Sequence, residues 1–223
     1  MAHQRIHKLT FVSKNSHLGK NVSIGPFSVV GLPARSSEGR GSAGRRVRDI
    51  LPALVGDGTV IGPNVIIEEG VKIGENVIIE SGAVIEKGSS IGAGTLIVHG
   101  ARILADVRIG KKCVISGLIS DRCSIGNHSR VFGNLIHRQD NPLLSWDGTI
   151  EESPIIDEYV FISFGAQVIG NVRIGDHSYV CANAVVTRDV KPRQIVVGNN
   201  RSIPHSKWKG KLRQSNFWKE LIK

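Results

Sequence analysis

The chain has 223 residues, of which 40% are hydrophobic and 22% charged, with 26 glycines and only 5% aromatics. This composition is typical of a soluble protein of one domain, and the scarcity of aromatics excludes a layered core built on Phe and Trp. The formal charge of +10 comes from two segments, residues 191–223 with nine Lys/Arg against one acid and residues 33–50 with five Arg against two acids.

Targeting signals and reactive thiol motifs are absent from the sequence. No run approaches the ~20 apolar residues of a membrane helix, and the first ten residues lack the apolar block of a secretory signal. Cys113, Cys123 and Cys181 form no CxxC pair. We therefore expect a cytoplasmic protein without a membrane partner. The basic segments do not alternate with aromatics, so we expect no nucleic-acid partner.

The N-terminal part of the chain already shows a six-residue period, at Leu18 and Ile24. An interruption over residues 32–54 follows, rich in Gly, Ser and Arg and without an apolar period. One interpretation is a solvated loop. The other is an arm that offers Arg45, Arg46 or Arg48 to a phosphate or an acidic acceptor.

From residue 55 onwards an aliphatic residue recurs at every sixth position, and a small or β-branched residue stands four positions after each. The aliphatic series is Val55, Ile61, Ile67, Ile73, Ile79, Ile85, Ile91, Ile97, Ile103, Ile109 and Ile115. It continues at Ile119, Ile125 and Val131, and again at Ile156, Ile162, Val168, Ile174, Val180 and Val186.

A period of six fits neither a helix nor simple strand alternation. It is typical of a coil of short strands, each followed by a corner that needs Gly, Asn or Asp. The large aliphatic residue fills the interior, and stacking at ~4.8 Å pairs each strand with those above and below. Three hexads in each coil would give a triangular prism of roughly six coils.

The second interruption covers residues 137–153. The series ending at Val131 predicts an aliphatic residue at position 137, where the sequence has His137. Acyl transfer from a thioester needs a general base, and His suits this role because its unperturbed pKa is near neutrality. Of the eight histidines, only His137 stands where a regular coil meets a long irregular loop.

The C-terminal segment, residues 206–223, is predicted to be a basic α-helix with an apolar side that caps the open end of the coils. The predicted organisation is therefore a β-helix domain over residues 1–205, with insertions at 32–54 and 137–153, followed by this helix.

The segment from Asn134 to His137, together with Asn141 and Pro142, resembles the coil-to-loop exit of hexapeptide-repeat acetyltransferases. These are the enzymes that act on maltose, galactosides and streptogramins. The stretch from Ile162 to Arg201 is similar to their closing segment. The repeat resemblance covers residues 18–30 and 55–201, and the acetyltransferase signature is confined to about 130–201. This resemblance implies a left-handed, three-sided parallel β-helix, acetyl-CoA as co-substrate without a metal, and a homotrimer with sites between subunits.

The resemblance also implies roles for individual residues. His137 would be the general base, and Asn134 would position the acceptor or the thioester oxygen. The pantetheine arm of coenzyme A would contact the backbone of Gly165, Ala166 and Ala184. The phosphates of coenzyme A would be bound by the guanidinium groups of Arg188 and Arg201. The acceptor would be a sugar, an amino sugar or a related small molecule.

Two other functions use the same scaffold. A gamma-class carbonic anhydrase would place three histidines on zinc, for which His99, His128 and His137 are the candidates, although the close His pair of that class is missing. A non-catalytic scaffold subunit would bind no coenzyme A derivative. The sequence does not distinguish O- from N-acylation, or acetyl from longer acyl donors.

Overall fold

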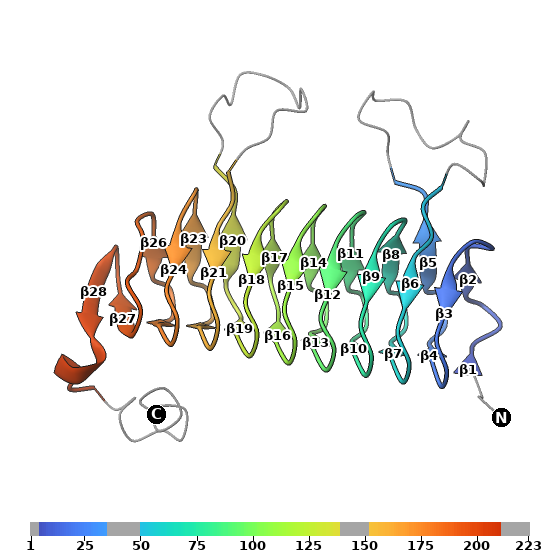
Figure 1. Cartoon of the computed structure of the whole chain (residues 1–223), viewed down its shortest axis with the longest axis horizontal. Helices are drawn as coiled ribbons and strands as arrows, with labels where there is room; N and C mark the ends of the chain where they lie inside the picture. The colour runs from blue at the N-terminus through green and yellow to red at the C-terminus, as the bar shows by residue number, and fades with distance from the viewer. Residues whose placement is uncertain (1–4, 35–49, 139–151, 211–223) are drawn as a thin grey trace.

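The computed structural model describes residues 5–34, 50–138 and 152–210, which form an elongated prism of short strands (Figure 1). Successive strands turn from one face of the prism to the next, so each strand pairs with the strand three places later in the chain. Ile78, for example, is in register with Val60 on one side and with Leu96 on the other. The predicted left-handed parallel β-helix is confirmed.

Three sheets form the faces of the prism, and we call them A, B and C. Sheet A contains 11 strands, which are β1 (Arg5–Ile6), β4 (Ser23–Ile24), β7 (Val60–Ile61), β10 (Ile78–Ile79), β13 (Leu96–Ile97), β16 (Val114–Ile115), β19 (Arg130–Val131), β22 (Phe161–Ile162), β25 (Tyr179–Val180), β27 (Gln194–Val197) and β28 (Arg201–Pro204). Sheet B contains nine strands, which are β2 (Phe11–Val12), β5 (Val29–Leu32), β8 (Ile66–Glu68), β11 (Val84–Ile85), β14 (Arg102–Ile103), β17 (Leu118–Ile119), β20 (Asn134–Ile136), β23 (Gln167–Ile169) and β26 (Val185–Val186). Sheet C contains eight strands, which are β3 (His17–Leu18), β6 (Leu54–Val55), β9 (Lys72–Ile73), β12 (Ser90–Ile91), β15 (Arg108–Ile109), β18 (Ser124–Ile125), β21 (Ile155–Ile156) and β24 (Arg173–Ile174).

The nine strands of sheet B correspond to nine coils, so the predicted number of about six was too low. Part of the difference lies at the two ends, where β1 and β2 precede Leu18, the first periodic residue, and β27 follows Val186, the last one. A further part comes from β5 and β20, whose core residues Val30 and Leu135 adjoin the two insertions and were not in the series. We name the corners AB, BC and CA after the sheets that they join in chain direction.

The aliphatic residue of each hexad points into the prism and is buried, as predicted. Ile97, Ile103 and Ile115 are completely inaccessible to solvent. The small residue of the hexad lies at a corner, where a hydroxyl can satisfy backbone groups of two coils. The Thr95 hydroxyl donates to the Gly110 carbonyl (2.9 Å) and accepts from the Cys113 N–H (3.1 Å). The interior therefore contains hydrogen-bonded hydroxyls besides aliphatic side chains.

Two corners are shorter than the period of six. Core residues Ile115 and Ile119 are four positions apart, and so are Val131 and Leu135. Gly117, with a φ of 78°, permits the first of these tight corners. A Cβ at Gly133 would collide with the Ala166 carbonyl oxygen, so the second corner also requires glycine. Stacked residues on β17 and β20 are consequently 16 positions apart, instead of 18.

Both insertions leave the prism at corner BC (Figure 1). The first follows β5, and the buried carboxylate of Glu69 joins its two ends by accepting from the backbone N–H groups of Ala34 and Leu51 (both 2.9 Å). The second follows β20, and the Arg138 N–H donates to the Glu152 carbonyl at its base (2.9 Å). Residues 35–49 and 139–151 lie outside the described residues, and so does the proposed arm of Arg45, Arg46 and Arg48.

The C-terminal end of the prism is closed by an antiparallel strand. β28 pairs with β27, with Ile203 opposite Ile195, and a 3₁₀ turn (His205–Lys207) follows. Trp208 then packs against Ile195, as do Tyr179 and Val197. The predicted helix over 206–223 is not present between Trp208 and Gly210, and residues 211–223 lie outside the described residues. No helix in the described part of the chain is long and apolar enough to cross a bilayer.

Candidate active site at corner BC

His137 lies immediately after β20, at the base of the second insertion. Leu135, and not His137, occupies the core position of this hexad, because the preceding corner is two residues short. The interpretation of His137 as a replacement for a core aliphatic residue was therefore wrong. Its side chain is 23% exposed, so the imidazole is partly shielded and can still reach solvent.

Two residues of the preceding coil hold His137 in place. The Ser120 hydroxyl accepts a hydrogen bond from the His137 backbone N–H (2.6 Å). The Asp121 carboxylate lies beside the ring, with Oδ2 3.9 Å from Nδ1. The other carboxylate oxygen, Oδ1, accepts from the Ala105 N–H (2.9 Å), which orients the group. At 3.9 Å the carboxylate is close enough for an ion pair with a protonated ring but too distant for a hydrogen bond.

The sequence interpretation missed Asp121 and Ser120. With a strict hexad period, the residue beneath His137 would be 18 positions earlier, at Ile119. The tight corner at Gly133 shortens this spacing to 16, which brings Asp121 under His137. This glycine was the sequence signal that could have revealed the pair.

Other carboxylates line the outside of sheet B near the same corner. The pKa of the half-buried Glu86 is raised, chiefly by burial and then by repulsion from the Glu68 and Asp121 carboxylates. Ser153, at the base of the second insertion, contacts the same region, because its hydroxyl donates a hydrogen bond to the Asp121 backbone carbonyl (2.5 Å). The carboxylates Glu68, Glu86 and Asp121 thus gather near corner BC, with the Arg102 and Lys87 cations close to Glu86.

Asn134 lies at the opposite end of β20, at corner AB. Its side-chain oxygen accepts from the Leu118 N–H (2.9 Å), and its amide nitrogen donates to the Gln167 side-chain oxygen (3.3 Å). Three residues of extended strand separate it from His137, which corresponds to about 10 Å. A ligand would have to span that distance to contact both residues.

The residues predicted to contact pantetheine also lie at corner AB. Gly165 has a φ of 71°, and a Cβ there would collide with Asn183 Oδ1, so glycine is required. Ala166 and Ala184 have fully buried side chains. Their N–H groups donate to the carbonyls of Ser163 (3.2 Å) and Cys181 (3.1 Å). Only a carbonyl lone pair of either alanine is therefore available for a ligand.

The two predicted phosphate-binding arginines lie near the C-terminal end of the prism. Arg188 is at corner BC, two coils beyond His137, which corresponds to about 10 Å. Arg201 begins β28, and both arginines are exposed. Thr187 and Asn200, which precede them, are hydrogen-bonded to each other (2.8 Å and 2.9 Å). The fold thus brings the backbones at positions 188 and 201 close together, although 13 residues separate them.

The described residues support neither a nucleophilic cysteine nor a zinc site of three histidines within one chain. Burial raises the pKa of the Cys113 thiol to about 11 and that of Cys123 to about 12, and it also raises the pKa of Cys181. His99, His128 and His137 occupy corners AB, CA and BC, so they cannot share one ion within a chain. Residues 5–34, 50–138 and 152–210 contain no cluster of three His, Cys, Asp or Glu side chains suited to a metal.

Sequence comparisons match the repeat on both sides of the second insertion. The bacterial transferase hexapeptide family (six repeats) matches residues 52–87 and 153–188. The chain is 44% identical over 45 residues to the serine acetyltransferase of Mycobacterium tuberculosis, a match that covers 20% of each chain. It is 29% identical over 90 residues to the bifunctional protein GlmU of Geobacter metallireducens, covering 40% of this chain and 18% of that one. The chain thus matches only a fifth or less of the length of these relatives.

Structure comparison supports the fold along nearly the whole chain. The structure of LpxA from Acinetobacter baumannii matches with a TM-score of 0.63, covering 94% of this chain and 80% of that chain. The sequence identity is 16%, so this likeness concerns the fold alone.

Proposed function

Because this chain is a hexapeptide-repeat protein folded as a parallel β-helix, we propose that it transfers an acyl group from coenzyme A to a small acceptor. The observation that carries the proposal is the His137 imidazole, positioned by Ser120 and Asp121 at the base of an insertion. A matching relative named as an acetyltransferase supports acetyl-CoA as the donor.

Acyl-CoA would supply the activated acyl group. His137 would accept the proton of the acceptor hydroxyl or amine at Nε2 as the nucleophile attacks, and would return it to the departing thiolate. Asp121 would hold the ring in this orientation and stabilise the imidazolium. Arg188 and Arg201 are the proposed phosphate contacts, with Gly165, Ala166 and Ala184 along the pantetheine arm and Asn134 at the far end of the site.

An amino sugar is the acceptor class that the charges near His137 favour. Glu68, Glu86 and Asp121 would attract a cationic amine and would repel an anionic acceptor. Thiol release from acetyl-CoA, screened against amino sugars, neutral sugars and simple amines, tests this assignment. Turnover with amino sugars is the expected result, and no turnover with any acceptor would contradict the proposed activity.

Replacing Asp121 with asparagine is expected to lower kcat roughly 10- to 100-fold with little change in KM, because Asp121 acts through His137 and does not touch the substrate. The Ala105 N–H can still bond the amide oxygen, so the fold should be retained. Steady-state kinetics and the melting temperature are the measurements. An unchanged kcat, or a loss explained entirely by unfolding, would remove Asp121 from this role.

The outward faces of two sheets support a homotrimer. On sheet A, Val60, Ile78, Leu96 and Val114 stand in register on the outside, with Val60 44% and Ile78 48% exposed. Sheet B presents Val29, Ile66 and Val84 in the same way. In the middle of sheet C, Lys72, Ser90, Arg108 and Ser124 take these positions, and Leu54 and Ile155 follow towards its ends. Two faces with apolar centres and one with a polar centre suit a ring in which each chain has two neighbours.

Replacing Ile78 with lysine is therefore expected to convert the trimer to monomers, because a charge would be buried against an apolar neighbour. Ser90→Lys on sheet C is the matched control, since it adds the same side chain to the polar face. Light scattering coupled to gel filtration gives the mass of each variant. A monomeric wild-type protein, or identical masses for all three, would contradict the proposed interface.

We also propose a reducing compartment, the cytoplasm. Cys113, Cys123 and Cys181 are all free thiols, as expected where disulfides do not form.

A further inference from the structure

Phe27 has a backbone conformation that aromatic residues rarely adopt, and Tyr159, which shares it, stacks on His128 and His177 within the chain. The φ of Phe27 is 60°, at corner AB, where the next coils place Asn64, Gly82 and Gly100. Those residue types tolerate the left-handed region, whereas a bulky side chain is strained there. The Phe27 side chain is 61% exposed, so burial in the core does not offset the strain. A strained and exposed aromatic residue points to a contact outside the chain.

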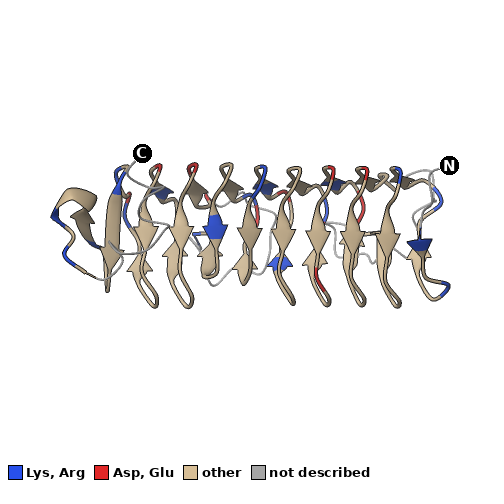
Figure 2. Cartoon of the chain, turned by 90° about the horizontal axis from the view of Figure 1, so that it is seen from below, with Lys and Arg blue, Asp and Glu red and all other residues tan. Residues whose placement is uncertain are grey.

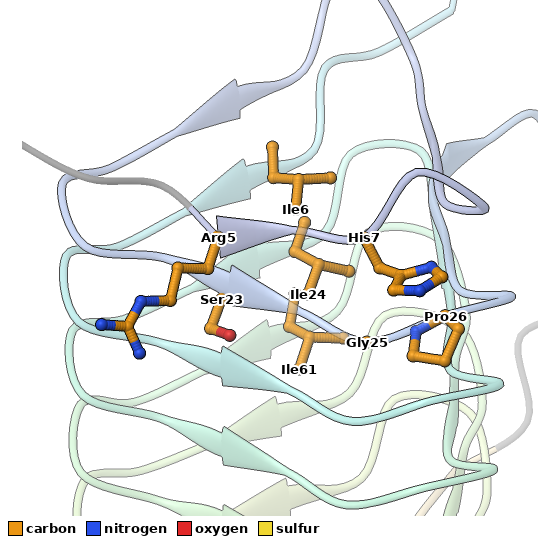
Figure 3. Close-up of a pocket in the computed structure, with 8 residues that line it drawn as sticks. All are labelled: Arg5, Ile6, His7, Ser23, Ile24, Gly25, Pro26 and Ile61. Atoms are coloured by element: carbon orange, nitrogen blue, oxygen red, sulfur yellow. The ribbon is translucent and has the colours of Figure 1, made fainter.

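Three further apolar side chains are exposed in the first coil, at the same end of the prism as Phe27. Leu9 is 52% exposed and its carbonyl accepts from the Phe27 N–H (3.0 Å), while Phe11 is 55% exposed. Ile6 lies at the open end of the core column above Ile24 and Ile61, beside a hollow that reaches Pro26 (Figure 3). Ile6 is 40% exposed, whereas Ile24 is 2% exposed. We call Ile6, Leu9, Phe11 and Phe27 the tip patch.

The first coil contains Lys and Arg side chains but no Asp or Glu. Lys8, Lys14 and Lys20 are exposed, one at each corner of the first coil, and residues 5–34 contain no Asp or Glu. Figure 2 shows Lys and Arg at this end of the prism. The nearby Asp57 carboxylate accepts from the Lys20 backbone N–H (2.8 Å). The end of the prism is thus a triangle with an apolar edge and a cation at each corner.

We infer that this end binds the surface of a bilayer that contains anionic phospholipids. A flat anionic surface can meet all three lysines at once, and the tip patch spans two coils, about 5 Å, which matches the depth to which interfacial apolar groups enter. The sequence-based expectation of no membrane partner rested on the lack of a spanning segment, which a surface contact does not require.

Other occupants fit the end less well. β1, β2 and β3 are two-residue strands on three different faces, so they offer no long edge to an added strand of a partner protein. A second copy beside sheet B, as in the proposed trimer, would cover Phe11, which is in register with Val29, but would leave Ile6 at the open end uncovered. A second copy docked end to end would bring like-charged lysines together. A lipid surface satisfies both the apolar and the cationic features.

The test is co-sedimentation of the full chain with phosphatidylcholine vesicles that contain about one third phosphatidylglycerol, and with pure phosphatidylcholine vesicles. We expect binding to the anionic vesicles, weakened at high salt, and at least roughly 10-fold weaker binding for Phe27→Asn. Lys8→Glu should weaken it about 5-fold or more. The melting temperature of Phe27→Asn should stay the same or rise, since Asn tolerates this conformation.

Leu51→Asn is the matched control, because Leu51 is also 61% exposed but lies at the base of the first insertion. It should bind vesicles like the wild type. Equal binding of Phe27→Asn and wild type, or no binding to anionic vesicles, would overturn the inference. A fall in oligomer mass caused by Phe27→Asn would assign the patch to a second copy, and capture by an acidic peptide without vesicle binding would assign it to a protein.

Discussion

Replacing His137 with alanine is expected to lower kcat for thiol release from acetyl-CoA by about 10²- to 10⁴-fold. Removing the imidazole eliminates the proposed general base, which lies beside Asp121 of the preceding coil. The side chain is partly exposed and fills no core position, since Leu135 does so. The variant should therefore fold like the wild type, and its KM for acetyl-CoA should change little.

His99→Ala is a suitable control for this measurement. His99 lies at corner AB and its Nδ1 is 2.8 Å from the Ser81 hydroxyl, so its loss tests the general effect of removing a corner imidazole. Turnover should be unaffected by it. Equal turnover of His137→Ala and wild type would exclude His137 as the base. It would leave the fold and the tip patch untouched, because neither depends on catalysis.

Replacing Ile156 with alanine is expected to destabilise the protein by about 2–5 kcal/mol, the range found when a fully buried aliphatic residue is truncated. Ile156 is 1% exposed and pairs with Ile125 and Ile174 in the column of core residues. Each coil contacts only its neighbours, so the cavity cannot be filled by a rearrangement of distant parts. Denaturation by urea, followed by circular dichroism, gives the change in unfolding free energy.

Ile155→Ala provides a control within the same strand. Ile155 points outward from sheet C and is 38% exposed, so the same truncation should change the stability by no more than about 0.5 kcal/mol. Similar losses for the two variants would mean that inward and outward positions do not alternate as described. That result would contradict the assignment of the core.

The hexad pattern by itself determined the fold class and nearly all of the core. Large aliphatic residues at every sixth position can all be buried together only inside a coil of short strands. This pattern can be recognised from neighbouring residues in the sequence alone. Ile61, Ile79 and Ile97 could therefore be assigned to the interior without knowledge of any contact. The positions of both insertions followed from the same pattern, because a loop can leave such a coil only at a corner.

The pairing between coils was decided by the tertiary structure alone. Whether Ile119 or Asp121 lies beneath His137 depends on the length of the corner at Gly133, and a shift of two residues exchanges a core side chain for a carboxylate. The distribution of His99, His128 and His137 over three corners, and the exposure of Phe27 beside Leu9, depend on the same register. The sequence shows the period of the coil. Which side chains meet across coils depends on the number of residues in each corner, because this number sets the register between stacked strands.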